Sequence, residues 1–261
     1  MTKNPEQAPV TVRPLVLAHR GSTGNRGRDA EMSAAPTSPG SGSSPGLPVR
    51  ENTLAAFSRA RDLGADGVEL DVRLSADGHL VVHHDPSIEG GGPVHELTRA
   101  ELPAHVPGLD EVLEACRGLL VNIEIKNLPG EASFDPDERT AHLVMDLLAG
   151  RIGDDIVISS FWPGSLSAVR ARDAGVATGL LLASWANPEG ALAMARDVGA
   201  TAVHPHFSLV EARWVAEAHR KGFKVNVWTV NEPDDVVAAG KVGVDAVITD
   251  DVPGAREALG P

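Results

Sequence analysis

The sequence LGADGVELDV at positions 63–72 contains the two signals that decide the fold. Gly64 follows a segment of helical periodicity and suits the position after a helix, where the left-handed backbone conformation favours glycine. The apolar run that comes next predicts a buried strand over 67–73, with Glu69 and Asp71 on one of its faces. This order of helix, glycine and strand is typical of a parallel sheet whose strands are joined by helices.

The same unit recurs along the chain. A glycine is predicted to follow a helix and precede a strand at 175, 199, 222 and 243. A helix is predicted to begin at Asn187 and Pro188. A capping box is predicted at 208–211, at the start of a helix that runs to Lys221. Strands are predicted at 15–18, 67–73, 80–83, 119–126, 156–159, 178–182, 202–204, 224–229 and 246–249. Eight units, with the strand at 80–83 set aside, predict an α/β fold of the (β/α)8 TIM barrel type. The alternative is an open doubly wound sheet, but His19-Arg20-Gly21 does not fit its glycine-rich phosphate loop.

We expect one barrel domain over 1–261, with an N-terminal tail at 1–12. Positions 22–50 are rich in Ser, Gly and Pro and predict a flexible insertion, either inert or acting as a lid. Positions 85–107 predict a small excursion between the second and third barrel strands.

Composition excludes several classes of protein. The net charge of −13 argues against nucleic-acid binding and against stable association with anionic membranes. No apolar run is long enough to span a membrane, and the first residues lack the pattern of a signal peptide, so a cytoplasmic location is the expectation. Cys116 is the single cysteine, which excludes an internal disulfide and a cysteine metal cluster. The oligomeric state stays open.

Three carboxylates are predicted to converge at the carboxyl ends of barrel strands. The strand period places Glu69 beside Asp71, and Asn122, Glu124 and Lys126 on one face of another strand. In a barrel, catalytic groups come from these strand ends. Three carboxylates there predict a site for one hard divalent cation, Mg²⁺ or Ca²⁺. The alternative is that these acids only form ion pairs with Arg73 and Lys126.

Two histidines follow apolar strands and are candidates for general acid and base, His19 and His84. His83 is a rival to His84, although strand alternation directs the two to opposite faces. Arg20 offers a planar donor pair to a phosphate or a carboxylate. The other histidines are interpreted mostly as surface or loop residues: 79, 95, 105, 142, 204, 206 and 219.

Charge favours a phosphodiester as substrate. Three carboxylates and one divalent cation leave a charge of about −1, and Arg20 and Lys126 bring the site to about +1. A singly charged phosphodiester would neutralise it.

The ordered motifs resemble those of the glycerophosphodiester phosphodiesterases. They are HRG at 19–21, ENTL at 51–54, ELDV at 69–72, HD at 84–85, EIK at 124–126, VWTVN at 227–231 and ITDD at 248–251. The resemblance implies a (β/α)8 barrel that hydrolyses glycerophosphodiesters to glycerol 3-phosphate and an alcohol with a divalent cation. We expect the substrate to be a small-molecule, water-soluble glycerophosphodiester.

By motif position, the resemblance assigns a role to each candidate residue. Glu69, Asp71 and Glu124 would bind the metal, His19 and His84 would be the acid/base pair, and Arg20 and Lys126 would hold the phosphate. Glu51 would lie near the metal or orient one of these groups, Asn52 or Thr53 would cap a helix, and Trp228 would be an apolar wall or a core residue. The nucleophile would be the glycerol 2-hydroxyl, through a cyclic phosphate, or water.

Three alternatives stay open at this point. A lysophospholipase D-like diesterase would need an apolar trough for an acyl chain. Proton abstraction beside a carboxylate, with Lys126 as base, fits the paired histidines less well. A barrel that only binds a phosphate ligand would be expected to have lost a metal ligand or a histidine. Two departures from the family pattern concern substrate choice: the length of 22–50, and the segment after Asp85, which lacks an Arg-Thr-Thr stretch.

Overall fold

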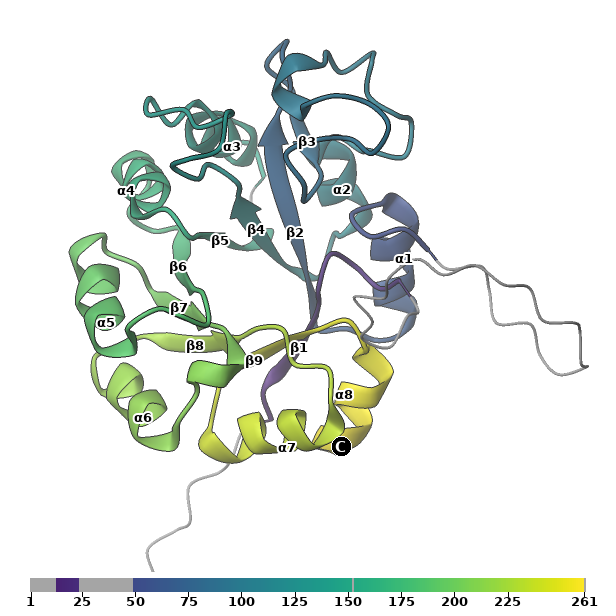
Figure 1. Cartoon of the computed structure of the whole chain (residues 1–261). Helices are drawn as coiled ribbons and strands as arrows, with labels where there is room; N and C mark the ends of the chain where they lie inside the picture. Colours follow the sequence, from purple (N-terminus) through teal and green to yellow (C-terminus); the bar gives the residue numbers. More distant parts are fainter. Residues whose placement is uncertain (1–12, 24–48, 152, 261) are drawn as a thin grey trace, which may run out of the picture.

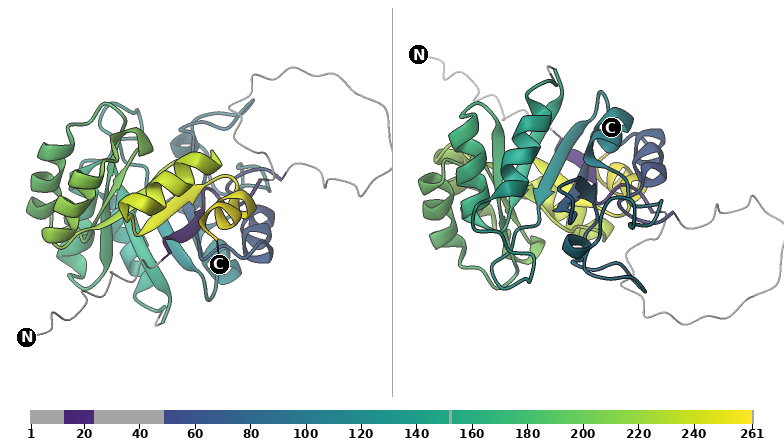
Figure 2. Two further views of the ribbon diagram at one scale, coloured as in Figure 1. Left: turned by 90° about the horizontal axis from the view of Figure 1, so that it is seen from below. Right: turned by 90° about the horizontal axis from the view of Figure 1, so that it is seen from above.

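The structure is a computed structural model that describes residues 13–23, 49–151 and 153–260. Eight parallel strands, β1, β2 and β4–β9, close into a barrel because β1 pairs with both β9 and β2. The strands surround the barrel axis and the helices lie outside them (Figure 1). Side views show the helices packed along the outer surface of the strands (Figure 2).

The elements alternate as a TIM barrel requires. The strands are β1 Leu15–Ala18, β2 Gly67–Leu74, β3 Leu80–Val82, β4 Leu120–Ile125, β5 Asp155–Ser160, β6 Ala177–Leu182, β7 Ala202–Pro205, β8 Lys224–Val227 and β9 Ala246–Thr249. The α-helices are α1 Leu54–Asp62, α2 Leu109–Ala115, α3 Arg139–Leu148, α4 Pro163–Arg172, α5 Pro188–Asp197, α6 Ala212–Arg220, α7 Pro233–Val242 and α8 Val252–Leu259. Two short 3-10 helices, η1 Val94–Glu96 and η2 Phe207–Leu209, complete the described elements.

The predicted barrel is confirmed, and the pairing of β1 with β2 excludes the open sheet. All nine predicted strands are present to within a few residues. Asn187 begins α5 as predicted, because its side chain accepts a hydrogen bond from the main-chain N–H of Glu189 (3.1 Å). Among the described residues, no helix is both long and apolar enough to cross a membrane.

Two local predictions are wrong. The capping box predicted at 208–211 does not form, since Ser208 lies within η2 and contacts His206, and α6 begins only after Glu211. Gly175 is not in the left-handed region, because α4 already ends at Asp173 in an extended conformation. The glycines at 64, 199, 222 and 243 do have positive φ.

The segment after β2 forms a small structure of its own. β3 pairs antiparallel with the end of β2, which extends beyond the barrel. A separate apolar cluster fills the space under 85–107, made of Val81, Ile88, Val94, Leu102 and Val106. The tail predicted at 1–12 and positions 24–48 of the predicted insertion lie outside the described residues.

Main-chain hydrogen bonds join the two described borders of the predicted insertion. The N–H of Val49 donates to the carbonyl of Thr23 (3.1 Å), and the N–H of Asn52 donates to the carbonyl of Arg20 (2.9 Å). The N–H of Ser22 donates to the carbonyl of Ala56 in α1 (3.0 Å). The residues on either side of positions 24–48 are therefore held to each other and to α1.

One histidine predicted to lie at the surface is instead fully buried. The interpretation of His204 as a surface or loop residue is wrong, because it lies on β7 with 0% exposure, facing the barrel interior. Its Nε2 atom is 2.9 Å from Asn226 Nδ2. A side chain at Gly179 would place its Cβ only 2.2 Å from this nitrogen, so the glycine of β6 makes room for the imidazole.

Burial lowers the pKa of His204 to about 3, which makes stability depend on pH. The unfolded chain binds this proton near pH 6.5 and the folded protein does not, so stability falls as pH falls below 6.5. Between pH 7.5 and 5.5 we expect the wild type to lose about 1.4 kcal/mol more of its unfolding free energy than His204→Asn. Urea unfolding in EDTA measures both. Equal losses in the two proteins would refute the prediction.

Candidate active site

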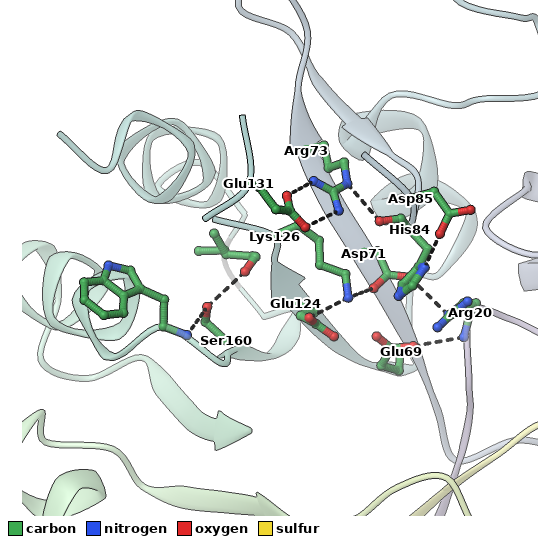
Figure 3. A network of polar contacts seen from close by, with 12 residues as sticks. Arg20, Glu69, Asp71, Arg73, His84, Asp85, Glu124, Lys126, Glu131 and Ser160 are labelled. Carbon is green, nitrogen blue, oxygen red and sulfur yellow. Dashed lines mark hydrogen bonds and ion pairs between the residues drawn. The ribbon is translucent and has the colours of Figure 1, made fainter. Parts of the chain in front are cut away.

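Three buried carboxylates lie together at the carboxyl ends of β2 and β4. Glu69 and Asp71 alternate along β2, and the register of the two strands places Asp71 opposite Glu124. One oxygen from each carboxylate lies within 4.8 Å of the others, and their exposures are 4%, 1% and 7%. Figure 3 shows the three side chains directed toward one another.

Lys126 forms ion pairs with two of these carboxylates. Its Nζ lies 3.0 Å from Asp71 Oδ1 and 2.7 Å from Glu124 Oε1 (Figure 3). Burial opposes the charge, but the two carboxylates outweigh it and raise the pKa of Lys126. The alternative that Arg73 also pairs with the three acids is wrong, because Arg73 pairs with Glu131.

The turn after β1 brings Arg20 to the carboxylates. Arg20 has φ 54°, and this backbone conformation aims its N–H at Glu69 Oε2 (3.0 Å). Its guanidinium lies between two acids, with Nη1 2.9 Å from Glu51 Oε1 and Nε 3.4 Å from Asp71 Oδ2. Glu51 therefore contacts and orients Arg20.

The start of α1 is built around the same turn. Thr53 is the N-cap, since its hydroxyl accepts from the N–H of Ala56 (3.3 Å). This leaves Asn52, also at positive φ, free to reach the site, where its Nδ2 donates to Asp71 Oδ2 (2.8 Å). Asp71 is thus held by an amide in addition to its two cations.

The cluster has too little positive charge for three ionised carboxylates. Burial would raise the pKa of Asp71, but Lys126 and Arg20 lower it below its usual value. Burial, together with the nearby charge of Asp71, raises the pKa of Glu69 to about 8. Burial also raises the pKa of Glu124. A divalent cation would supply the missing charge, and an all-carboxylate set of ligands suits a hard one.

Each candidate histidine has a carboxylate on its Nδ1 atom. His19 Nδ1 lies 2.8 Å from Asp250 Oδ1, and His84 Nδ1 lies 2.8 Å from Asp85 Oδ1. Burial would lower the pKa of His19, but Asp250 and Glu69 raise it. Burial and the nearby Lys126 lower the pKa of His84. The two imidazoles therefore differ in proton affinity.

A pocket of about 130 Å³ brings the candidate residues together. The pocket is lined by both candidate histidines and by Arg20, Glu69, Glu124, Lys126, Trp228, Asn122, Phe161, Leu181 and Ile248. Trp228 stands at the wall, edge-on to Phe161 at a centroid distance of 5.6 Å, and its Nε1 donates to the carbonyl of His204 (2.7 Å). His83 is not among the lining residues.

The sequence reasoning did not predict Asn52, Asp85 or Asp250 as site residues, although each contacts a candidate group, and it also missed Asn231, which contacts Asp250. Asn231 Nδ2 donates to Asp250 Oδ2 (2.7 Å) and its Oδ1 accepts the N–H of Asp250 (2.9 Å). Asn231 therefore fixes the carboxylate that contacts His19. Register could have found Asp250, since it continues β9 one residue beyond the pairing of Ala18 with Thr249 and so lies beside His19.

Replacing Asp250 by asparagine should lower kcat roughly 10- to 100-fold, because an amide no longer selects the tautomer of His19. The neighbouring Asp251 supplies the control, since its Oδ1 caps α8 by accepting the N–H of Gly254 (3.1 Å) and asparagine is an equally good cap. Steady-state kinetics compares the two variants. A kcat for Asp250→Asn equal to that of Asp251→Asn would contradict this role.

Known proteins with the same fold and sequence pattern identify the family. Residues 19–253 match the model of the glycerophosphoryl diester phosphodiesterase family. The chain therefore belongs to this family, and the predicted family and enzyme class are confirmed. A glycerophosphodiester phosphodiesterase of Caldanaerobacter subterraneus subsp. tengcongensis is 32% identical, over 92% of this chain and 95% of the relative.

Solved structures agree with this assignment. The structure of a phosphodiesterase from Oleispira antarctica, in complex with the product sn-glycerol-3-phosphate, is similar at a TM-score of 0.78 and 25% identity, covering 94% of this chain and 96% of that one. A glycerophosphodiester phosphodiesterase from Thermotoga maritima has a TM-score of 0.70 and 26% identity, covering 92% and 96% of the two chains.

Proposed function

We propose that the chain hydrolyses small glycerophosphodiesters to glycerol 3-phosphate and an alcohol, with one divalent cation and with His19 and His84 as the acid/base pair. The observation that carries the proposal is the convergence of two histidines, two cationic side chains and two buried carboxylates, Glu69 and Glu124, on one pocket, with the third carboxylate, Asp71, beside them. Membership of a phosphodiesterase family supports it.

Glu69, Asp71 and Glu124 would hold the cation, either Mg²⁺ or Ca²⁺. When bound, such an ion polarises a phosphoryl oxygen and stabilises the negative charge that develops there. The raised pKa of Glu69 supports the assignment, since a carboxylate deprived of positive charge is one that a cation would return to its ionised form.

Arg20 and Lys126 would bind the phosphate. Both side chains are already held in place by acids, so they meet an anion without having to be ordered on binding. With the three carboxylates and a divalent cation, the site carries about +1, and Glu51, which pairs with Arg20, brings this to about 0. Preference for a diester would therefore come from direct contacts of the phosphate with Arg20, Lys126 and the cation.

His19 and His84 would transfer the protons. One imidazole accepts a proton from the attacking hydroxyl, of the glycerol itself or of water, and the other donates one to the departing alkoxide. Their opposite pKa shifts support this division, because an acid and a base in one site need different proton affinities. Asp250 and Asp85 would hold the rings in the required tautomers.

The apolar wall formed by Trp228, Phe161, Leu181 and Ile248 would contact the carbon atoms of the glycerol or the leaving alcohol.

Release of glycerol 3-phosphate from the small diesters, and of choline from the lyso-lipid, tests the proposed function. The purified protein is incubated with glycerophosphocholine, glycerophosphoethanolamine or lysophosphatidylcholine, in Mg²⁺, Ca²⁺ or EDTA. We expect release of glycerol 3-phosphate from the two small diesters in the presence of a divalent cation, and no release in EDTA. Turnover of the lyso-lipid alone would favour the lipid-acting alternative, and no turnover despite cation binding would reject the proposal.

A further inference from the structure

Arg73 connects the loop that carries His84 to the loop that follows β4. It lies on β2 two residues beyond Asp71, with 5% exposure. Its Nε donates to the main-chain carbonyl of His84 (2.8 Å), and its Nη1 and Nη2 donate to the two carboxylate oxygens of Glu131 (2.7 and 3.3 Å). Figure 3 shows the guanidinium between Glu131 and His84.

We propose that Arg73 is a positioning residue that fixes the backbone of His84, and that Glu131 in turn fixes Arg73. This inference rests on the proposed function, since it gives His84 a role in proton transfer. The proposal extends the site to two residues that do not line its pocket.

The contacts around His84 explain why its backbone needs such support. His84 lies beyond the end of β3, in a segment with no strand or helix of its own until η1. The N–H of His83 donates to the carbonyl of Asp71 (2.9 Å), so the chain leaves the barrel strand immediately before His84. Arg73 then holds the carbonyl of the next residue. The imidazole of His84 contacts Asp85, whose side chain is 70% exposed and which belongs to the same segment.

Only arginine can make both contacts. The guanidinium presents its donors in a rigid plane, so Nε and the two terminal nitrogens reach the carbonyl and the carboxylate together. The compact ammonium of a lysine has one nitrogen and cannot lie at both acceptors. Ser133 Oγ donates to Glu131 Oε2 (3.1 Å), so Glu131 is held from its own loop as well.

A double-mutant cycle separates positioning of His84 from a general structural role. In the wild-type background, Arg73→Lys should lower kcat roughly 10- to 100-fold with little change in KM, because misplacing a catalytic group by about 1 Å has an effect of that size. In the His84→Ala background, the same substitution should change the residual kcat by less than about twofold. An equal loss in both backgrounds, or no loss in the wild-type background, would overturn the proposal.

Two further variants complete the kinetic test. Glu131→Gln should lower kcat in the same direction by a smaller factor, and it carries the test if Arg73→Lys does not fold. Arg61→Lys is the matched control, because Arg61 Nη2 also donates to main-chain carbonyls, those of Ala115 and Arg117 (2.6 and 2.9 Å), far from the pocket. It should leave kcat unchanged.

A measurement without substrate keeps this proposal separate from the proposed function. Histidine ring signals are recorded by NMR on labelled protein in EDTA, and the His84 signal is assigned from its loss in His84→Ala. Arg73→Lys and Glu131→Gln should shift or broaden the His84 signal and leave that of His19 in place. An unchanged His84 signal would overturn the positioning role. If the wild type cleaves no diester, the proposed function fails and the NMR result still decides where His84 is held.

Discussion

Replacing Glu69 by glutamine should abolish turnover while leaving the cation-free protein as stable as the wild type. The pKa of Glu69 is raised to about 8, so at pH 7 this carboxyl is mostly protonated when no cation is bound, and glutamine has the same shape and charge. The substitution removes a ligand that must be ionised to bind a metal, and we expect kcat to fall by roughly 10³-fold or more.

Thermal unfolding in EDTA compares the stability of the two cation-free proteins. Thermal unfolding in excess Mg²⁺ or Ca²⁺ measures how far the cation stabilises each of them. A cation at about 100 times its Kd stabilises the wild type by about 2.7 kcal/mol, and Glu69→Gln should gain much less. Glu138→Gln is the control, because Glu138 is also buried but accepts a hydrogen bond from Ser165 Oγ (2.6 Å) away from the three carboxylates. Equal cation-induced stabilisation of wild type and Glu69→Gln would show that Glu69 does not bind the metal.

Removing either imidazole should lower kcat by about 10²- to 10⁴-fold, which is the range that a positioned general acid or base contributes. His19→Ala and His84→Ala are compared at saturating glycerophosphocholine. Binding of the cation, followed by calorimetry, should persist in both variants because the three carboxylates are intact.

His83→Ala is the matched control for His84→Ala. The two residues are neighbours after β3, but the His83 side chain lies 3.3 Å from the carbonyl of Ser87 and does not line the pocket. We expect its kcat to stay within about twofold of the wild type. A larger loss in His83→Ala than in His84→Ala would reverse the assignment.

The barrel could be predicted from the sequence because its signals are local and repeated. The strand of 67–73 and the glycine before it are readable within ten residues, and the same pattern recurs at each unit. The three carboxylates follow from the strand period and from the rule that parallel strands end on one face of a barrel. Their assignment as a metal site needs no contact other than strand register.

The groups that were missed depend on contacts between distant parts of the chain. Asp250 lies 231 residues from His19, and Arg73 meets Glu131 across two loops, so no local pattern records either contact. His204 was misplaced because a lone histidine is usually near the surface, whereas here Gly179 on the next strand makes room for it. The helix start predicted at Ser208 is wrong because Ser208 lies within η2 and its hydroxyl contacts Nδ1 of the neighbouring His206 (2.8 Å).

Main-chain hydrogen bonds join Thr23 to Val49 and Arg20 to Asn52. They separate the geometry of the active site from the length of the sequence between these borders, two properties that usually change together. Arg20 and Asn52 contact the carboxylates from opposite borders of the predicted insertion, yet each is fixed by bonds among residues outside positions 24–48. The number and identity of the residues between these borders can therefore change without resetting the geometry of the site. New residues can therefore be inserted at this place beside the active site, in the course of evolution or by protein engineering.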